Sequence, residues 1–369
     1  RRAAATMGAN ALVLTGDAGN LAGFTNTATG DLGLASMTMG GNVTVGLTAG
    51  SAIAATGVVS FTNADNVLTL SGVANPGSIY PLLTGTSIDA SGSIALTGAA
   101  VGNLVIPLGS SATVGRTTYA FANTGTALEL GVTGTRLTLT WTGRDTSFWN
   151  YNEAISNWSD NGTPTFFGVG DNAVIDAATT ISVRPAGVAA SDVSVTNPTG
   201  TVTLNSGTLA AASLTKTQAG TLELAGPLSS NLVTVSAGSL TVTGIGSLEA
   251  TSLVNNATVE YAVTEDRTLS AGLSGNGLLA QIGTARLTLN GVGDYAGSLS
   301  VAAGSVLELG PAALLGPGGV YSGGIAVAGE LVAASSTGQD LAGPLTGFGT
   351  LTKSGDGVVT ISGDNAGST

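Results

Sequence analysis

The densest group of side chains that could do chemistry lies between positions 141 and 167. Seven aromatic residues fall in this segment, and the carboxylates of Asp145, Glu153 and Asp160 lie among them. Ring faces cover the C–H surfaces of sugars while polar groups fix the hydroxyls, so exposed rings beside carboxylates would form a sugar-binding platform. The candidates for ligand binding are Trp149, Tyr151, Trp158 and Asp145.

The same rings have an alternative role, which is to pack against one another. Large aromatic side chains are rarely exposed together, because burying each of them stabilises the fold. We therefore favour a small satellite core, placed where one segment of the structure meets the next.

The carboxylates offer a further chemistry, the hydrolysis of a polysaccharide. Asp145 paired with Glu153 or Asp160 would supply an acid and a base, but the sequence fixes no separation between them. The chain has no His and no Cys, which excludes a Ser-His-Asp triad, a histidine base and thiolate or imidazole metal sites. We expect no enzymatic activity, no catalytic residues and no cofactor.

Oxygen ligands for calcium are present at Asp171, Asn172 and Asp176. Carboxylate and amide oxygens suit this ion, but the spacing matches neither an EF-hand loop nor the Gly-Gly-x-Gly-x-Asp calcium repeat. Ordinary turn and cap chemistry is the favoured interpretation, and we expect no metal site.

Charge and hydropathy exclude two further classes of partner. The chain of 369 residues carries 10 Lys and Arg against 22 Asp and Glu, a formal net charge of -12, which repels the phosphate backbone of nucleic acids. A membrane-spanning helix needs ~20 predominantly apolar residues, and the longest uncharged stretches are interrupted by Gly, Thr, Ser or Asn. We expect no binding to nucleic acid and no membrane insertion by this segment.

The elements that must position these residues are short strands. Apolar residues alternate with small polar ones, as in Val202-Thr203-Leu204 and Leu240-Thr241-Val242, and such alternation predicts β-structure. The window from Gly347 to Gly363 repeats the window from Gly275 to Gly291, and a third copy spans 214–226. A repeating unit of this kind predicts coils of about 20–25 residues, roughly 15–18 in all.

The sequence therefore predicts an all-β fold, an elongated parallel β-helix, or β-solenoid, with right-handed coils. We expect a solenoid segment over 1–140, an aromatic-rich junction over 141–180 that opens a new repeat unit, and a solenoid over 181–369, all in one continuous rod. Lys216 and Lys353 occupy matching positions, and we predict that they lie at the ends of the strand ladders and hinder lateral β-pairing.

The repeats resemble the passenger-associated repeats of bacterial autotransporters, which have the typical sequence pattern Gly-x-Leu-x-Lys-x-Gly-x-Gly-x-Leu-Thr-Leu-Ser-Gly-x-Asn-x-Tyr-x-Gly. The matching residues of the last copy are Leu351, Lys353, Gly355, Gly357, Thr360, Ser362, Gly363 and Asn365. The copy over 275–297 has Gln281 in place of Lys, Ala285 in place of the second Gly and Gly293 in place of Asn, but keeps Tyr295 and Gly297.

A second motif extends this resemblance toward the N-terminus. Trp141-Thr142-Gly143, followed by Asn157-Trp158 and Gly170-Asp171, resembles the opening of a unit in the same family. The resemblance covers 137–369 well, and 1–136 only by composition and alternation. The last copy lacks the Tyr and the sequence stops at Thr369, so we expect a fragment of a longer passenger.

The resemblance implies a non-enzymatic extracellular protein, an autotransporter-type passenger that acts as an adhesin or stalk. Such a passenger is secreted or displayed on the surface of a Gram-negative-type bacterium, and an outer-membrane barrel is expected outside this segment. Its partners would be a host-cell or matrix glycan or protein, or copies of itself. The alternative is a self-assembling component of a surface fibre or layer, because a solenoid leaves open strand edges at its ends; a polysaccharide-degrading β-helix enzyme is third.

Overall fold

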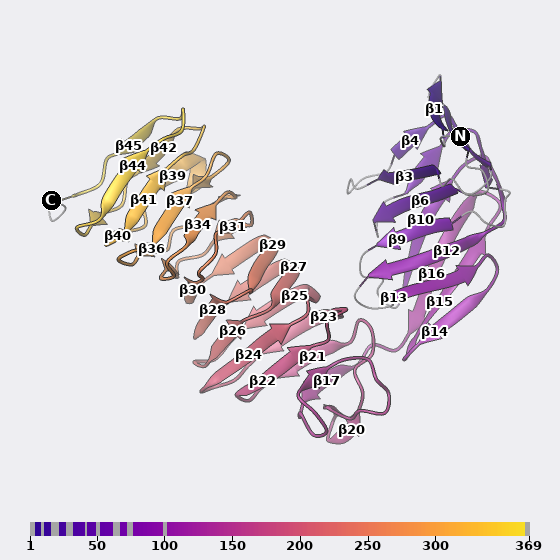
Figure 1. Ribbon diagram of the computed structural model, residues 1–369, viewed down its shortest axis with the longest axis horizontal. Helices are drawn as coiled ribbons and strands as arrows, with labels where there is room; N and C mark the ends of the chain where they lie inside the picture. The colour runs from indigo at the N-terminus through magenta and orange to yellow at the C-terminus, as the bar shows by residue number, and fades with distance from the viewer. Residues whose placement is uncertain are drawn as a thin grey trace. The chain divides into compact units, whose positions relative to one another are not determined.

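The computed structural model describes residues 4–8, 11–15, 22–26, 32–40, 43–48, 52–61, 67–71, 77–98 and 102–365. Strands make up 59% of the structure and helix 1%. Parallel sheets stack as a β-solenoid of about 15 turns (Figure 1). The predicted all-β parallel solenoid is confirmed.

The chain divides into two compact units. The first comprises 1–137 with 168–170, and the second comprises 138–167 with 171–369. Each is described by itself below.

The first unit winds coils whose strands add to three parallel stacks. One stack contains β2 (Ala11–Thr15), β5 (Ser36–Gly40), β8 (Val58–Phe61) and β11 (Ser87–Ala90). Another contains β3 (Ala22–Asn26), β6 (Val43–Thr48), β9 (Val67–Ser71) and β12 (Ser93–Gly98). The third contains β4 (Leu32–Leu34), β7 (Ile53–Ala55) and β10 (Ser78–Thr84).

Antiparallel strands lie at the ends of these stacks. β1 (Ala4–Gly8) pairs antiparallel with β2, and β13 (Gly102–Pro107) pairs antiparallel with β12. The third stack continues antiparallel through β16 (Ala127–Gly134), β15 (Thr117–Asn123) and β14 (Ser111–Val114). These reversals differ from a purely parallel solenoid, and sequence alternation does not reveal them because it has the same period in either direction.

The second unit has two long parallel sheets. The first runs through β17 (Thr138–Trp141), β21 (Asn172–Ile175), β23 (Val188–Val195), β25 (Leu209–Lys216), β27 (Pro227–Val235), β29 (Ser247–Asn255) and β32 (Gly272–Ser274). The other runs through β18 (Phe148–Trp149), β22 (Thr179–Val183), β24 (Thr201–Ser206), β26 (Thr221–Leu224), β28 (Ser239–Thr243), β30 (Thr258–Ala262), β33 (Leu278–Gln281), β36 (Ser298–Val301), β40 (Ile325–Val327) and β43 (Leu345–Thr346).

The later coils of this unit have three faces. Pairing between β23 and β25 skips Ser191 and Ala212, so these long strands turn a corner in the middle. From Arg267 onward the two halves are separate strands. One half continues as β31 (Arg267–Leu269), β34 (Arg286–Leu289), β37 (Val306–Leu309), β41 (Glu330–Ala333) and β44 (Thr350–Lys353). The other includes β35 (Val292–Gly293), β38 (Leu314–Leu315), β39 (Val320–Tyr321), β42 (Gln339–Leu341) and β45 (Val359–Ile361).

Columns of apolar side chains form the core between these faces. Thr258 pairs with Leu278, and Leu278 with Ser298, so these coils repeat every 20 residues. The inward neighbours in the same register, Val259, Leu279 and Leu299, are 0%, 0% and 1% exposed. Burial of each such side chain stabilises the fold by about 1.5–3 kcal/mol, but only while a neighbouring coil covers it.

Candidate functional site

The aromatic residues of the predicted binding platform are buried. Trp149, Trp158 and Phe167 are 0%, 1% and 0% exposed, and Trp141 is 7% exposed. The ring centres of Trp149 and Trp158 lie 4.9 Å apart, and each lies 4.7–5.0 Å from that of Phe167. We call these four residues the aromatic cap. The premise of an exposed platform on Trp149 and Trp158 is wrong, because the rings cover one another as in the favoured small core.

An antiparallel hairpin holds part of the aromatic cap at the start of the second unit. β19 (Trp158–Asp160) pairs antiparallel with β17 and with β20 (Thr163–Thr165). Its turn holds Asn161 and Gly162 at φ of 48° and 90°, a left-handed pair that suits a tight hairpin. Trp141 lies opposite Trp158 in register, with ring centres 5.1 Å apart and planes at 80°. The stack of coils from β21 onward follows this hairpin (Figure 1).

Asn157 holds the loop between β17 and β18, a role that sequence reasoning missed. It is 1% exposed. Its Oδ1 accepts hydrogen bonds from the backbone N–H of Asp145 at 3.0 Å and of Thr146 at 2.8 Å. Its Nδ2 donates to Thr146 Oγ1 and to the carbonyl of Phe148, both at 2.8 Å. The feature of the sequence that could have indicated this role is the Asn157-Trp158 pair. Trp158 is buried, and Asn157 beside it is buried as well.

The other two binding candidates reach the surface. Tyr151 is half-buried; its hydroxyl donates to the carbonyl of Ala189 at 3.1 Å, and the guanidinium carbon of Arg184 lies 5.2 Å from its ring centre. Asp145 is exposed, and its Oδ2 accepts from the backbone N–H of Ser156 at 2.6 Å. Both side chains fasten the loop to its surroundings, and the structure does not bring them together with Trp149 and Trp158 on one surface.

Among the remaining acidic candidates, Asp160 takes part in a local hydrogen bond. Asp160 Oδ1 accepts from Asn161 Nδ2 at 2.9 Å, while Glu153 is exposed. Asp171 is 1% exposed, and Asn172 Nδ2 donates to Thr138 Oγ1 at 3.1 Å. Within the described ranges, no three His, Cys, Asp or Glu side chains gather as a metal ion would require.

Lys216 lies in the interior, which corrects the prediction that it hinders lateral pairing. It is 0% exposed, and its Nζ donates to the carbonyls of Thr217 at 2.6 Å and Gln218 at 2.9 Å. Burial lowers the pKa of this amine, because a charged group loses solvation inside the protein. The strand ends at Lys216 with its side chain on the inner face, which places the amine against the turn that follows.

The same contact recurs at the matching positions of other coils. Gln281 is 0% exposed, and its Nε2 donates to the carbonyls of Gly283 at 3.1 Å and Ala285 at 2.5 Å. The Nζ of Lys353, which is exposed, donates to the carbonyl of Gly355. The Lys or Gln of the repeat is therefore a donor that satisfies the carbonyls of its own turn.

The Tyr-x-Gly of the repeat joins one coil to the preceding one. The hydroxyl of Tyr295 donates to the carbonyl of Gly277 at 2.7 Å, and that of Tyr321 to the carbonyl of Gly297 at 2.6 Å. The two rings stack at 9° with centres 6.3 Å apart. Burial raises the pKa of Tyr295 to about 12 and that of Tyr321 further. Tyr321 therefore repeats the role of Tyr295 one coil later. The coil between them is longer and contains a 3-10 turn at Pro317–Gly319, so the regular spacing of the repeat is not evident in the sequence there.

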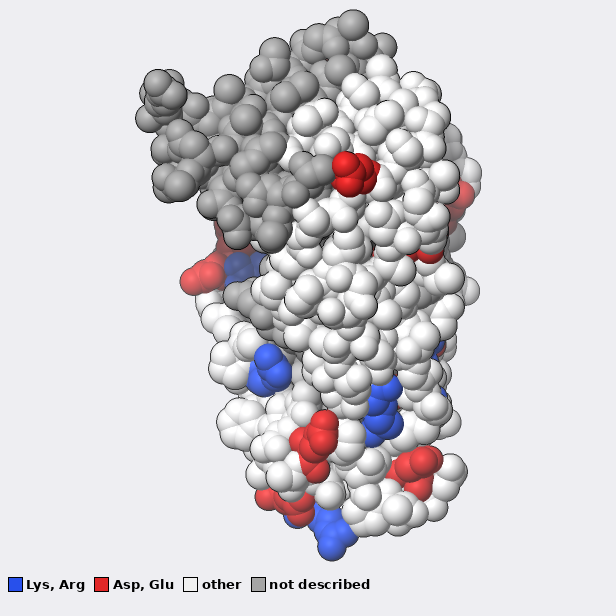
Figure 2. Space-filling model, turned by 90° about the vertical axis from the view of Figure 1, so that its right-hand side faces the viewer, with Lys and Arg blue, Asp and Glu red and all other residues white. Residues whose placement is uncertain are grey.

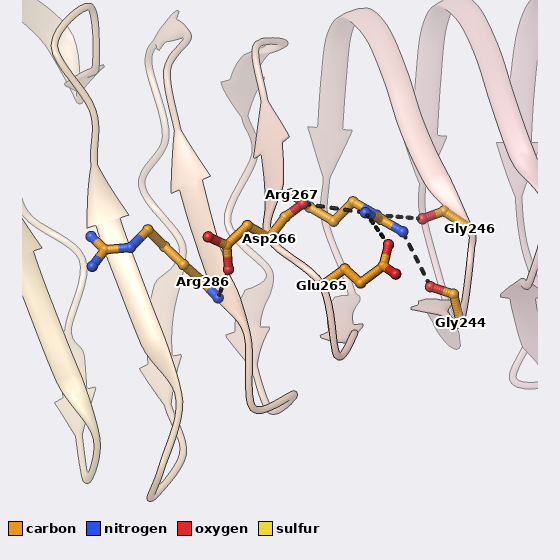
Figure 3. A network of polar contacts seen from close by, with 6 residues as sticks. All are labelled: Gly244, Gly246, Glu265, Asp266, Arg267 and Arg286. Carbon is orange, nitrogen blue, oxygen red and sulfur yellow. Dashed lines mark hydrogen bonds and ion pairs between the residues drawn. The ribbon is translucent and has the colours of Figure 1, made fainter.

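A corner of the second unit carries charged residues on successive coils (Figure 3). Arg267 donates from Nε to the carbonyl of Gly246 at 3.1 Å and from Nη2 to that of Gly244 at 3.3 Å, both on the preceding coil. It also pairs with Glu265 at 3.4 Å. Asp266 Oδ1 accepts from the backbone N–H of Arg286 at 2.9 Å, and the Arg286 side chain pairs with Glu308. Apart from the pair between Arg267 and Glu265, these contacts again run from coil to coil.

Charge is otherwise sparse. On the face drawn in Figure 2, acidic and basic side chains lie scattered, without a broad region of one sign. In the described part of the chain, no helix has the length and apolar character needed to cross a membrane.

No protein-family model matches the chain, and the comparisons with curated proteins and with solved structures found no match.

Proposed function

We propose that this chain is a stalk segment of an extracellular, non-enzymatic bacterial surface protein of the autotransporter-passenger type. The observation that supports the proposal is that the polar residues of the repeat form hydrogen bonds within and between coils. Lys216 and Gln281 bond the turns of their own coils, and Tyr295 bonds the carbonyl of the coil before it. Lys216 and Tyr295 match the Lys and Tyr of the passenger repeat, and Gln281 stands where that repeat has Lys.

A stalk needs cohesion along its coils rather than a reactive site. Buried donors that are hydrogen-bonded to backbone carbonyls help to hold a fold in one arrangement, and in a solenoid each coil contacts only its neighbours. The backbone ladders, the Tyr-to-carbonyl bonds and the Arg267 contacts all join adjacent coils. A load applied along the stack would be shared among these bonds.

The stalk is favoured over the adhesin because of where the binding candidates lie. Trp149 and Trp158 are buried in the aromatic cap, so their faces are unavailable to a glycan. Tyr151 and Asp145 remain as the residues through which an adhesive contact with a host-cell or matrix glycan or protein would be made.

Surface location is tested on intact cells of the bacterium that makes the protein. Antibodies raised against the chain should label cells without permeabilisation, and external protease should remove the label. An antibody against a cytoplasmic protein serves as the control. Labelling that needs permeabilised cells would overturn the proposal.

Mechanical cohesion is tested by pulling the purified chain from its two ends. Over the regular coils, force should rise and fall in steps that each release one 20-residue coil, as between Thr258 and Leu278. Such a step lengthens the chain by about 70 Å at 3.3–3.6 Å per residue. Release of the whole second unit at low force in a single event would contradict the stalk.

Binding distinguishes stalk from adhesin. We expect no saturable binding of the chain to host cells or immobilised glycans. Saturable binding that Tyr151→Ala weakens, while Asn152→Ala on the same exposed loop does not, would establish the adhesin instead.

A further inference from the structure

Three asparagines of this chain are each followed by glycine, in a dipeptide that can lose its side-chain amide spontaneously. Glycine has no side chain to shield its backbone nitrogen, and this nitrogen can attack the side-chain carbonyl carbon of the asparagine before it. The three pairs are Asn161-Gly162, Asn276-Gly277 and Asn290-Gly291. All of them lie in the described part of the second unit, so the structure can distinguish them.

Contacts between coils restrain two of these pairs. The backbone N–H of Gly277 donates to the carbonyl of Asn255 on the preceding coil at 2.8 Å, so the attacking nitrogen belongs to the ladder between coils. Asn290 Oδ1 accepts from the backbone N–H of Ala312 on the next coil at 3.0 Å, which holds the side chain that would be attacked. In both pairs the attack must first break a bond between neighbouring coils.

The third pair forms the exposed turn of the hairpin between β19 and β20. Asn161 and Gly162 are both exposed, and a Cβ on Gly162 would meet no atom within 4 Å. The N–H of Gly162 donates to Ser159 Oγ at 3.0 Å. Asn161 Nδ2 donates to Asp160 Oδ1 at 2.9 Å. Both bonds are exposed and lie within the turn, so the peptide group between Asn161 and Gly162 can turn while the coils stay paired.

We propose that Asn161 is a site of spontaneous deamidation in the folded protein, whereas Asn276 and Asn290 keep their amides. The Gly162 nitrogen forms a bond to Cγ of Asn161, the bond from Cγ to Nδ2 breaks, and Nδ2 leaves as ammonia with the proton of the Gly162 nitrogen. Water then opens the resulting five-membered imide at either carbonyl, which gives aspartate or isoaspartate. This modification lies beyond the proposed function and does not rest on it.

Either product weakens the hairpin. The Nδ2 that donates to Asp160 is lost, and a second carboxylate takes its place beside the first, so the two negative charges repel. Isoaspartate also lengthens the backbone of the turn by a methylene group, which a tight two-residue hairpin turn does not accommodate. Because β19 carries Trp158 of the aromatic cap, the modification loosens the strand that holds this ring in place.

Peptide mass spectrometry of the full chain, incubated folded in mildly alkaline buffer, tests the site. Each conversion of an amide to an acid adds about 1 Da to its peptide. Asn161 should convert at least tenfold faster than Asn276 and Asn290. Similar rates at the three asparagines, faster conversion at either of the other two, or an unchanged Asn161 would overturn the proposal.

The same chain unfolded in urea is the matched control, because all three asparagines are then free of the coils and each is still followed by glycine. Their rates should converge, chiefly through faster conversion of Asn276 and Asn290. A tenfold preference for Asn161 that persists in urea would arise from the neighbouring sequence, and it would refute the role assigned to the contacts between coils.

Asn161→Asp reproduces the aspartate product and tests its effect on the hairpin. Amide hydrogen exchange in β19 and β20 should quicken at least twofold, and more at low salt, where charges are less screened. Asp160→Asn added to Asn161→Asp should restore slow exchange, because the pair again contains one amide and one carboxylate. Exchange as slow as in the wild type, or no restoration by the second change, would contradict repulsion between the two carboxylates.

Discussion

At the scale of single residues, buried polar side chains satisfy backbone groups that the strand ladders leave unpaired. Asn157 bonds three backbone groups of one loop, and Lys216 bonds two carbonyls of one turn. A buried backbone group without a partner destabilises a protein by about 1–3 kcal/mol. These polar side chains therefore stabilise the loops and turns between strands, while the columns of apolar side chains stabilise the strands themselves.

Asn157→Ala should lower the free energy of unfolding by about 2–4 kcal/mol, because it leaves the N–H groups of Asp145 and Thr146 without an acceptor. Urea denaturation measures the loss. Asn152→Ala is the control, since Asn152 is exposed and accepts one bond from the Ala154 N–H; we expect less than about 1 kcal/mol there. Equal losses would contradict the role of Asn157.

Lys216→Met should change how stability depends on pH. Burial lowers the pKa of the folded amine below its ordinary value of 10.5, which the unfolded chain keeps. Between these two values the unfolded state binds more protons, so the wild-type free energy of unfolding rises with pH through this window. The variant lacks this contribution, and the wild-type minus variant difference should rise with pH.

Denaturation curves of the two proteins at several pH values below 10.5 provide the measurement. The difference between proteins removes the contribution of the buried tyrosines, which both share. A difference that stays constant or falls with pH would show that Lys216 is not desolvated in the folded protein.

At the scale of elements, glycines let the coils approach one another closely. A Cβ on Gly297 would lie 2.1 Å from the carbonyl oxygen of Gly277 and 2.6 Å from the hydroxyl of Tyr295. These two atoms form the hydrogen bond that joins the coils. The Tyr-x-Gly of the repeat is thus one device, in which the glycine makes room for the tyrosine hydroxyl.

Gly297→Ala should destabilise the second unit by about 1–3 kcal/mol, because the added methyl group overlaps this hydrogen bond. Gly338→Ala is a matched control, since its Cβ would meet nothing closer than the Val358 carbonyl at 3.8 Å. Thermal unfolding of both variants tests the claim. A control as unstable as Gly297→Ala would point to backbone effects instead.

At the scale of the whole molecule, stability of a solenoid is nearly one-dimensional, because each coil contacts only its neighbours. The aromatic cap covers the first coils of the second unit. Loss of the aromatic cap should therefore destabilise the coils at that end more than the others.

Trp158→Ala should lower stability by about 3–5 kcal/mol. Amide hydrogen exchange should quicken most in β22 and β24 and least in β43 to β45. Phe148→Ala, at an aromatic residue 47% exposed nearby, should leave the exchange pattern unchanged. Uniform acceleration along the unit would mean that the coils unfold as one block.

The sequence by itself determined the class of fold. Alternation of apolar and small polar residues predicts strands, and the copies at Gly275 and Gly347 predict stacked coils; both follow from local geometry, which a short window of sequence contains. It also singled out the aromatic segment and the lysine positions of the repeat.

Only the tertiary structure decided which way those residues face. The same tryptophans would suit a sugar platform or a core, and the neighbours that bury Trp149 and Trp158 come together only on folding. A lysine is expected at the surface, yet the folding of the coils places Lys216 in the interior. The antiparallel pairing of β10 with β16 likewise depends on which strands meet, and pairing between segments this far apart leaves no local signal in the sequence.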